Sequence, residues 1–330
     1  MNARSSVKLG IVTAIGLLLS SSLALAQQKI SIGLASASLP GGAARLVKQM
    51  GFFEKHGIDA TVIPMENDTI AVSGMLAGSL QFVSTAGNQI VVSRSRNLDI
   101  VALRAVYSNF AGVLVLSKAA AGKLPDTAKA SLNDRLKALD GLLIASPGPT
   151  SSYTAVLAPA KQAGAKVRFT YMAQSAMVVA LESGAIQGFV ASAPFYAQPT
   201  VNGTGVVWIS GVKGEFDYAP AAASVLSTTS AFAKANPDVV KRVIAAFEDF
   251  AKALDERPAD VKTAIAAIFP TLDAKLLDVL YTSEAQGFHG RPVTIEDMKR
   301  EIEFTKASGV PLPNIDTLDP AAMIFQTKAN

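Results

Sequence analysis

Four uncharged stretches rich in serine and threonine carry the chemistry that this sequence offers to a ligand. They are residues 36–40 (SASLP), 84–88 (STAGN), 146–153 (SPGPTSSY) and 192–196 (SAPFY). Their hydroxyl and backbone N–H groups can bind a small oxyanion or a neutral polar solute. Such residues also cap helices, which is the competing interpretation of any single hydroxyl. Together they predict one ligand site formed by Ser36, Ser38, Leu39, Thr85, Ala86, Gly87, Gly148, Thr150, Ser151, Ser152, Tyr153, Ser192, Ala193, Pro194 and Phe195.

No comparable pattern indicates catalysis or metal binding. The chain has no cysteine and two histidines, His56 and His289, and neither histidine has a partner at the spacing of a metal site. A G-x-S-x-G nucleophile motif is absent. The adjacent carboxylates Glu248-Asp249 and Asp255-Glu256 fit the solvated face of a helix. We therefore expect a protein that is not an enzyme and that uses no metal and no cofactor.

Strands that alternate with helices must position the four stretches. Short apolar runs predict the strands, and the first strand is followed by a predicted helix over residues 41–53 that Gly57 ends. From residue 230 the sequence is almost entirely helical, with Pro237 and Pro258 at helix starts. This alternation predicts an α/β fold with parallel sheets. In such sheets ligands bind beyond the carboxyl ends of the strands, which is where the four stretches lie.

One helix–glycine–strand unit occurs once in each half of the chain, as GMLAGSLQFVSTAGN and as ALESGAIQGFVASAP. The two copies share a glycine, Gly78 or Gly184, and a glutamine, Gln81 or Gln187. The glycines suit the left-handed position just past a helix end, and the apolar run that follows suits a buried strand. The repeat predicts two α/β lobes of similar build that face each other across a ligand cleft.

The N-terminal segment has the pattern of a secretory signal peptide. Arg4 and Lys8 precede the uncharged run LGIVTAIGLLLSSSLALA, and Ala24-Leu25-Ala26 is a cleavage signal. A membrane anchor is the alternative, but the run is short and interrupted by Thr and Ser. We expect cleavage after Ala26, a periplasmic location, and a mature protein over residues 27–330 that is not inserted in a membrane.

The charge of the chain excludes a nucleic-acid partner. The net charge is +4, charged residues make up 17% of the chain, and lysine and arginine do not cluster in any stretch. Arg45, one turn into the first helix, could reach an anion but is expected at the surface, as are Arg104 and Arg168. We expect a monomer whose partner is a small solute.

Four segments carry a family resemblance. They are GFFEKHGIDATVI, LDGLLIASPGPTSSY, ALESGAIQGFVASAPF and AFAKANPDVVKRVIAAFEDFAKAL. Each segment resembles one found in periplasmic substrate-binding proteins of nitrate/sulfonate/taurine ABC importers, and the four occur in the same order. These proteins form part of a superfamily that is similar to thiamine-pyrimidine synthases. The chain departs from the family at Gln81 and Gln187, where the family has Asp, and at residues 191–193, where a Trp is common. The departures predict a pocket unlike that of characterised sulfonate or nitrate binders.

The resemblance implies the two-lobe periplasmic-binding-protein fold of type II. Lobe 1 would comprise residues 27–108 and 217–330, with the C-terminal helices packed on it, and lobe 2 residues 109–216. Two crossing segments, near residues 107–111 and 215–221, would form a hinge. The protein would close on a sulfonate-, nitrate- or taurine-like anion and deliver it to an ABC permease with its ATPase.

Other functions remain open beside this one. An aromatic carboxylate or a neutral pyrimidine-type solute also fits an uncharged Ser/Thr cleft with Tyr and Phe walls. The protein could equally be a periplasmic sensor that presents a ligand-dependent shape to a receptor. The pyrimidine-synthase branch of the superfamily is disfavoured, because its enzymes use a Cys/His-rich motif that this chain lacks.

Overall fold

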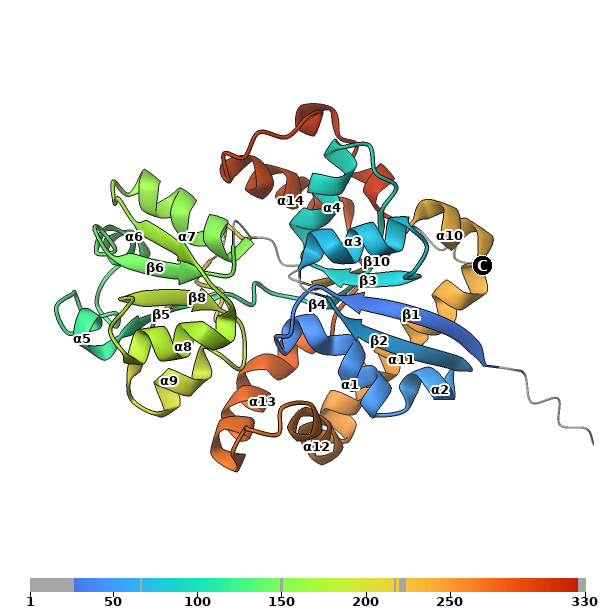
Figure 1. Cartoon of the computed structure of the whole chain (residues 1–330), viewed down its shortest axis with the longest axis horizontal. Helices are drawn as coiled ribbons and strands as arrows, with labels where there is room; N and C mark the ends of the chain where they lie inside the picture. Colours follow the sequence, from blue (N-terminus) through green and yellow to red (C-terminus); the bar gives the residue numbers. More distant parts are fainter. Residues whose placement is uncertain (1–26, 66, 149–150, 217, 220–223, 326–330) are drawn as a thin grey trace, which may run out of the picture.

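The computed structural model shows two five-stranded sheets, each covered by helices, with further helices along their sides (Figure 1). It describes residues 27–65, 67–148, 151–216, 218–219 and 224–325. The predicted signal peptide, residues 1–26, lies outside the described residues. Within the described ranges, no helix combines the length and the apolar character that crossing a membrane requires.

The first sheet has the strand order β2-β1-β3-β10-β4. Its inner strands are largely buried on both faces, and Ile32, Phe82 and Leu226 are fully buried along the middle of the sheet, whereas the edge strand Ile58–Pro64 begins with alternating buried and exposed residues. The strands are β1 (Gln28–Leu34), β2 (Ile58–Pro64), β3 (Phe82–Thr85), β4 (Val101–Tyr107) and β10 (Ser224–Thr228). The 3-10 turn η1 (Pro40–Gly42) and four helices connect them: α1 (Ala43–Gln49), α2 (Phe52–Lys55), α3 (Asp68–Leu76) and α4 (Gly87–Ser95).

The second sheet repeats this plan in the order β7-β6-β8-β5-β9. Its strands are β5 (Val113–Ser117), β6 (Leu143–Ser146), β7 (Arg168–Tyr171), β8 (Gly188–Ala191) and β9 (Gly205–Ser210). Its helices are α5 (Lys118–Ala121), α6 (Leu132–Lys137), α7 (Ser151–Gln162), α8 (Gln174–Glu182) and α9 (Ala197–Val201).

The repeated sequence unit occupies the same position in both sheets. Gly78 and Gly184 follow α3 and α8 with φ angles of +80° and +78°, and the strands after them, β3 and β8, are third in their sheets. The predicted two-lobe α/β fold is therefore confirmed. One strand of each sheet, β10 or β5, runs antiparallel to both neighbours. These two strands arrive directly from the other sheet, so no crossover helix makes them parallel.

The chain passes from the first sheet to the second between Tyr107 and Val113 and returns between Ser210 and Ser224. We use "first lobe" for residues 27–108 with 217–330 and "second lobe" for residues 109–216. These boundaries stay a prediction of the sequence.

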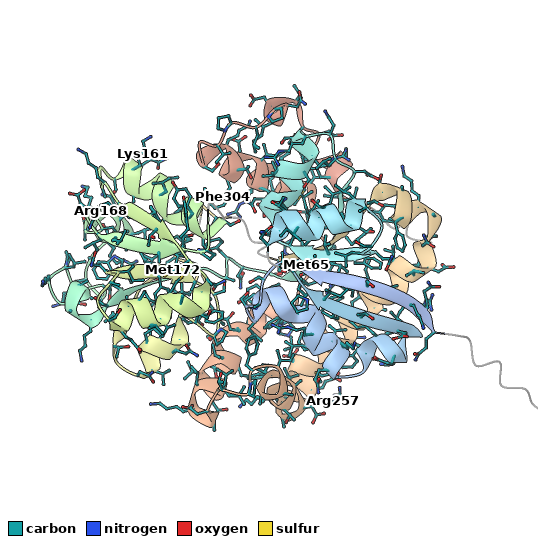
Figure 2. The ribbon with its side chains drawn as sticks, viewed as in Figure 1. Met65, Lys161, Arg168, Met172, Arg257 and Phe304 are labelled. Carbon is teal, nitrogen blue, oxygen red and sulfur yellow. The ribbon has the colours of Figure 1, made fainter. Side chains whose placement is uncertain are left out.

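Five helices end the chain. Pro237 and Pro258 stand at the first position of α11 and α12, as predicted. The apolar face of α11 packs on α1, α2 and β4. In addition, α13 contacts α9 and α14 contacts α7, both in the second lobe, and Phe304 of α14 lies at the boundary between the lobes (Figure 2). The helices are α10 (Ser230–Ala235), α11 (Pro237–Glu256), α12 (Pro258–Ile268), α13 (Ala274–Phe288) and α14 (Ile295–Ala307), followed by the 3-10 turns η2 (Ile315–Thr317) and η3 (Ala321–Met323).

The C-terminal segment also covers the outer edge of β4. Ala105 and Arg291 exchange two backbone hydrogen bonds of 2.9 and 3.0 Å, and the N–H of Phe325 donates to the carbonyl of Ala102 at 2.9 Å. An isolated parallel bridge joins Ala102 to Ile324. Part of the outer backbone edge of this strand is thus paired within the chain.

Two local predictions are wrong. The helix expected over residues 41–53 is divided into α1 and α2, because Gly51 takes a left-handed conformation with φ of +75°. Arg104, expected at the surface, is 7% exposed on β4, where its Nη1 pairs with Glu248 at 3.3 Å and its Nη2 donates to the carbonyl of His289 at 3.1 Å. Arg168 is exposed on the outer side of the second lobe, as expected (Figure 2).

Candidate functional site

A cavity of about 360 Å³ lies between the two lobes. Its first-lobe wall comes from the loops after β1, β2 and β3, and its second-lobe wall from the segments after β6, β7 and β8. Phe110, Ala111 and Gly112 of the first crossing segment line it as well. Met65, which follows β2, lies near the centre of the molecule (Figure 2) and lines the cavity as well. The cavity thus lies at the carboxyl ends of parallel strands, where ligands of α/β proteins bind.

Most of the predicted site residues lie in the wall of this cavity. They are Ser36, Ser38, Thr85, Ala86, Gly87, Ser151, Ser152, Ser192 and Phe195. Their role as ligand contacts stays a prediction, since a lining position alone does not establish one.

The other predicted residues lie elsewhere. Tyr153 packs against Phe169 with ring centroids 4.7 Å apart and does not line the cavity. Gly148 stands behind the wall, where its carbonyl accepts a hydrogen bond from Ser146 at 2.9 Å. Thr150 lies outside the described residues. The remaining residues outside the wall are Leu39, Ala193 and Pro194.

Some of the serine hydroxyls in the cavity wall form hydrogen bonds within the protein. The hydroxyl of Ser36 donates to that of Ser38 at 2.9 Å, and the Ser38 hydroxyl accepts from the N–H of Gly41 at 3.3 Å. These bonds hold the turn into η1, which is the capping role that competes with ligand binding. Thr85 differs, because its Oγ1 is buried and has no hydrogen-bond partner among the described residues.

The two lobes are in contact beside the cavity. The N–H of Leu39 donates to the carbonyl of Ala193 at 2.8 Å, so the backbones of the two lobes are bonded directly. Glu284 of α13, 1% exposed, accepts from the hydroxyl of Tyr196 at 2.6 Å and from that of Tyr107. Tyr196 belongs to the second lobe, whereas Tyr107 and Glu284 belong to the first. A buried carboxyl group therefore ties the lobes together.

Two carboxyl groups in the cavity wall were not among the predicted residues. Asp68, the first residue of α3, accepts from the N–H of Ala86 at 3.1 Å, and burial raises its pKa to about 6. Glu301 of α14 is 1% exposed, its Oε2 has no hydrogen-bond partner among the described residues, and burial raises its pKa well above the usual range.

The sequence contains a signal for each of these residues. Asp68 stands in the loop after the second strand, and the rule that selected the loops after the first and third strands also selects this one. Glu301 lies one turn from Met298 and Thr305 on the buried face of α14, so it is an acidic residue within a buried helix stripe. The other unpredicted lining residues are Ala35, Ala37, Pro40, Gly41, Met65, Asn67, Ser84, Phe110, Ala111, Gly112, Pro147, Ala173, Gln174, Ser175 and Ser224.

Neither histidine belongs to the cavity. His56 lies 2.7 Å from Asp249 and His289 lies 2.9 Å from Asp255, both on α11. In the part of the chain that the structure describes, no three His, Asp or Glu side chains are grouped closely enough to hold a metal ion.

Comparison with known families connects this geometry to other proteins. The sequence pattern of the NMT1-like family matches residues 40–269, from the cavity loop after β1 to the end of α12. The chain belongs to the NMT1-like family. The resemblance inferred from the four sequence segments is thereby confirmed. A search of curated protein sequences gave no match.

Solved structures share the fold of this NMT1-like protein. The alkanesulfonate-binding protein SsuA from Xanthomonas axonopodis pv. citri, bound to MOPS, has a TM-score of 0.71 at 14% identity, covering 91% of this chain and 98% of that one. The aliphatic sulphonate-binding protein SsuA from Escherichia coli has a TM-score of 0.69 at 17% identity, covering 91% and 99%. The nitrate-binding protein NrtA from Synechocystis PCC 6803 has a TM-score of 0.60 at 13% identity, covering 90% and 87%.

Two of the departures from the sulfonate and nitrate binders lie away from the cavity of the NMT1-like protein. Gln81 and Gln187 do not line it. The side chain of Gln81 accepts from the N–H of Ser31 within β1, and that of Gln187 accepts from the N–H of Leu143 at the start of β6. Residues 191–193 contribute Ser192 to the wall, while Ala191 and Ala193 are buried. The two glutamines therefore bond to neighbouring strands and do not form part of the cavity wall.

Proposed function

We propose that this protein is the periplasmic solute-binding component of an ABC importer, which captures a small organic solute between its lobes and delivers it to a permease. The observation that carries the proposal is the cavity of about 360 Å³, which is lined from both lobes and by Phe110, Ala111 and Gly112 of the first crossing segment. Closure of two lobes about a hinge encloses a ligand and changes the outer shape of the protein, which a permease can recognise.

The wall of the cavity fits a small molecule with polar and apolar parts. Three serines, Ser151, Ser152 and Ser192, line the second-lobe side, and Phe110 and Phe195 add apolar surface. Pockets for small molecules combine such apolar walls with a few polar groups. The described lining residues include no Lys, Arg or His side chain that could pair with the sulfonate-, nitrate- or taurine-like anion expected from the resemblance. An uncharged solute of aromatic or pyrimidine type meets no such difficulty.

Thermal denaturation in the presence of candidate solutes tests the proposal. Residues 27–330 would be unfolded, dialysed and refolded to remove carried-over ligand, then mixed with taurine, alkanesulfonates, nitrate, aromatic carboxylates, pyrimidines and amines. A solute at a hundred times its Kd stabilises the folded state by about 2.7 kcal/mol, which raises Tm by about 5 °C in a protein of this size. Small-angle scattering should show a smaller radius of gyration with the same solute. A panel without any shift or compaction would contradict the proposal.

A sensor role is the second candidate, because a closed shape can be read by a receptor as well as by a permease. The two differ in the partner of the closed form. Vesicles that contain the permease and ATPase should accumulate the solute only when this protein is added. Ligand binding with no transport in that assay would favour the sensor. Chemical conversion of the solute would instead favour an enzyme of the pyrimidine-synthase branch.

A further inference from the structure

The buried polar atoms of the cavity wall are unequally satisfied. Ser84 and Ser224 bond to each other at 2.9 Å, and Asp68 Oδ1 accepts from Ala86. Glu301 Oε2 and Thr85 Oγ1 are buried and have no hydrogen-bond partner in the described ranges. A buried polar group without a partner is costly, so two of them in one cavity wall indicate that something else supplies the bonds.

The charge of the cavity wall has one sign. Its charged side chains within the described residues are Asp68 and Glu301. Arg300, next to Glu301 on α14, directs its Nη2 to the carbonyl of Ala219 at 3.0 Å and does not line the cavity. Arg45 directs its Nη2 to the carbonyl of Ala37 at 3.0 Å, stacks on Phe269 and does not line it either.

The protein only partly compensates the charge of these carboxylates. Burial, the largest cause, and the nearby Asp297 raise the pKa of Glu301, and the charge of Arg300 does not cancel this rise. Burial also raises the pKa of Asp68, although backbone N–H groups, that of Ala86 among them, act in the opposite direction. An anion placed between the two groups would add repulsion, whereas a cation would supply the missing partner of Glu301 and the missing counter-charge together.

We infer that the solute is an organic cation, whose ammonium-type nitrogen donates to Glu301 and Thr85 and is held in the field of Asp68. This inference rests on the proposed solute-binding function. The nitrogen lies on the first-lobe side of the cavity, because Asp68, Thr85 and Glu301 all belong to that lobe. The second-lobe wall presents serine hydroxyls at the starts of α7 and α8, where a hydrogen-bond acceptor at the other end of the solute is favoured.

Matched probes that differ by the nitrogen test this inference. Butylammonium is compared with butanol and butyrate, and 3-aminopropanesulfonate with propanesulfonate, by calorimetric titration of the refolded, ligand-free protein. In each set, the compound with the amine should bind at least tenfold more tightly than the compounds that lack it.

Variants connect that preference to the two carboxyl groups. Glu301→Gln keeps the size of the side chain and should lower the affinity for the amine probes at least tenfold, and Asp68→Asn should lower it to a smaller extent. Glu303→Gln, on the same helix with a side chain 73% exposed, is the matched control and should leave the affinity unchanged. Equal melting temperatures of the variants would show that the change lies in binding.

The outcomes separate the inference from the function on which it rests. Two results would overturn the inference of a cationic solute and keep the solute-binding function. One is binding of propanesulfonate or butyrate as tight as that of the amine probes. The other is an affinity for the amine probes that Glu301→Gln leaves unchanged. A protein that binds no probe and no solute of the wider panel would overturn both. Amine-selective binding that is lost in Glu301→Gln and kept in Glu303→Gln would establish both.

Discussion

Gln81 and Gln187 make the same pair of hydrogen bonds in the two lobes. The N–H of Gln81 donates to the carbonyl of Ser31 at 3.0 Å, and its Oε1 accepts from the N–H of Ser31 at 2.8 Å. Gln187 does the same with Leu143, at 3.0 and 3.1 Å. Each glutamine side chain thus extends the pairing of two parallel strands by one hydrogen bond at the end opposite the cavity.

Replacement of either glutamine by alanine should lower stability and leave ligand binding unchanged. The N–H of Ser31 or Leu143 would lose its acceptor, at a cost of about 1 kcal/mol for each site. The losses should add in the double variant, because the two sites lie in different sheets. Urea denaturation measures the change, with Gln49→Ala on the exposed face of α1 as the control. A loss of solute affinity at full stability would contradict this structural role.

Replacement of Ser151 and Ser152 by alanine should weaken solute binding and leave the fold intact. Both residues are half-buried and line the cavity at the start of α7, so a ligand in the cavity can reach them. Loss of one or two hydrogen bonds of about 1 kcal/mol each lowers affinity by about fivefold to thirtyfold. Calorimetric titration of the double variant with a bound solute measures this. Unchanged affinity would move the site away from α7.

Gly148→Val should destabilise the second lobe as well as weaken binding. Gly148 has φ of +151°, a backbone conformation that glycine adopts readily and a β-branched residue does not. The expected strain is about 1–3 kcal/mol. Thermal denaturation and titration of the variant give the two effects separately. Wild-type stability would show that the turn tolerates a side chain.

Tyr196→Phe should shift the molecule towards an open form. The change removes the hydroxyl that joins the second lobe to Glu284 and keeps the ring, while Tyr107 still donates to the carboxyl group. Loss of about 1–2 kcal/mol from the contact lowers the apparent affinity about tenfold, because less of the protein is closed. Small-angle scattering should give a larger radius of gyration without ligand.

The control for this change lies within the helical segment. Tyr281→Phe removes a hydroxyl that donates to the carbonyl of Leu254, a contact between α13 and α11 that does not join the lobes. It should lower stability and leave the radius of gyration and the affinity as they are. An opening of equal size in both variants would mean that Tyr196 has no special part in closure.

Asp68 should make the ligand-free protein less stable as the pH rises. Its pKa is raised from 3.8 in the reference state to about 6 in the fold, so the folded protein holds the proton more tightly. The stabilising contribution is complete below about pH 4 and is lost as the pH rises through about 6. The difference corresponds to at most about 3 kcal/mol.

Asp68→Asn removes this dependence because its amide does not titrate. The stability of the variant relative to the wild type should rise between pH 4 and pH 8, which urea denaturation at several pH values measures. Asp59→Asn, with an exposed side chain on β2, should show no such trend. Parallel curves for wild type and Asp68→Asn would show that the carboxyl group is hydrated.

The fold could be predicted where local chemistry decides it. Gly78 and Gly184 mark helix ends because their backbone conformation excludes most other residues, and Pro237 marks a helix start because it lacks an N–H. The direction of a strand cannot be predicted in this way. β10 and β5 run antiparallel to their neighbours because of how they are connected, and no local sequence pattern shows these connections. The break at Gly51 cannot be predicted in this way, because the residues on both sides continue an apolar helical stripe.

The site could be predicted as a set of loops but not as a set of side chains. Strand ends gave the position of Ser36, Thr85 and Ser192. The orientation of Tyr153 cannot be predicted locally, because its ring packs against Phe169 on another element. Glu301 reaches the cavity only because α14, far away in sequence, packs against α4 and α7. Long-range packing of this kind leaves little trace in a single sequence.

The position of β10 in the chain governs the order in which the molecule can be assembled. The second sheet takes all its strands from residues 113–210, whereas the first needs β10 as its fourth strand and residues 291 and 324 on the edge of β4. A chain that emerges from its N-terminus can therefore complete its second lobe first. The first lobe keeps open strand edges until the end of synthesis, and in that interval a chaperone can hold it.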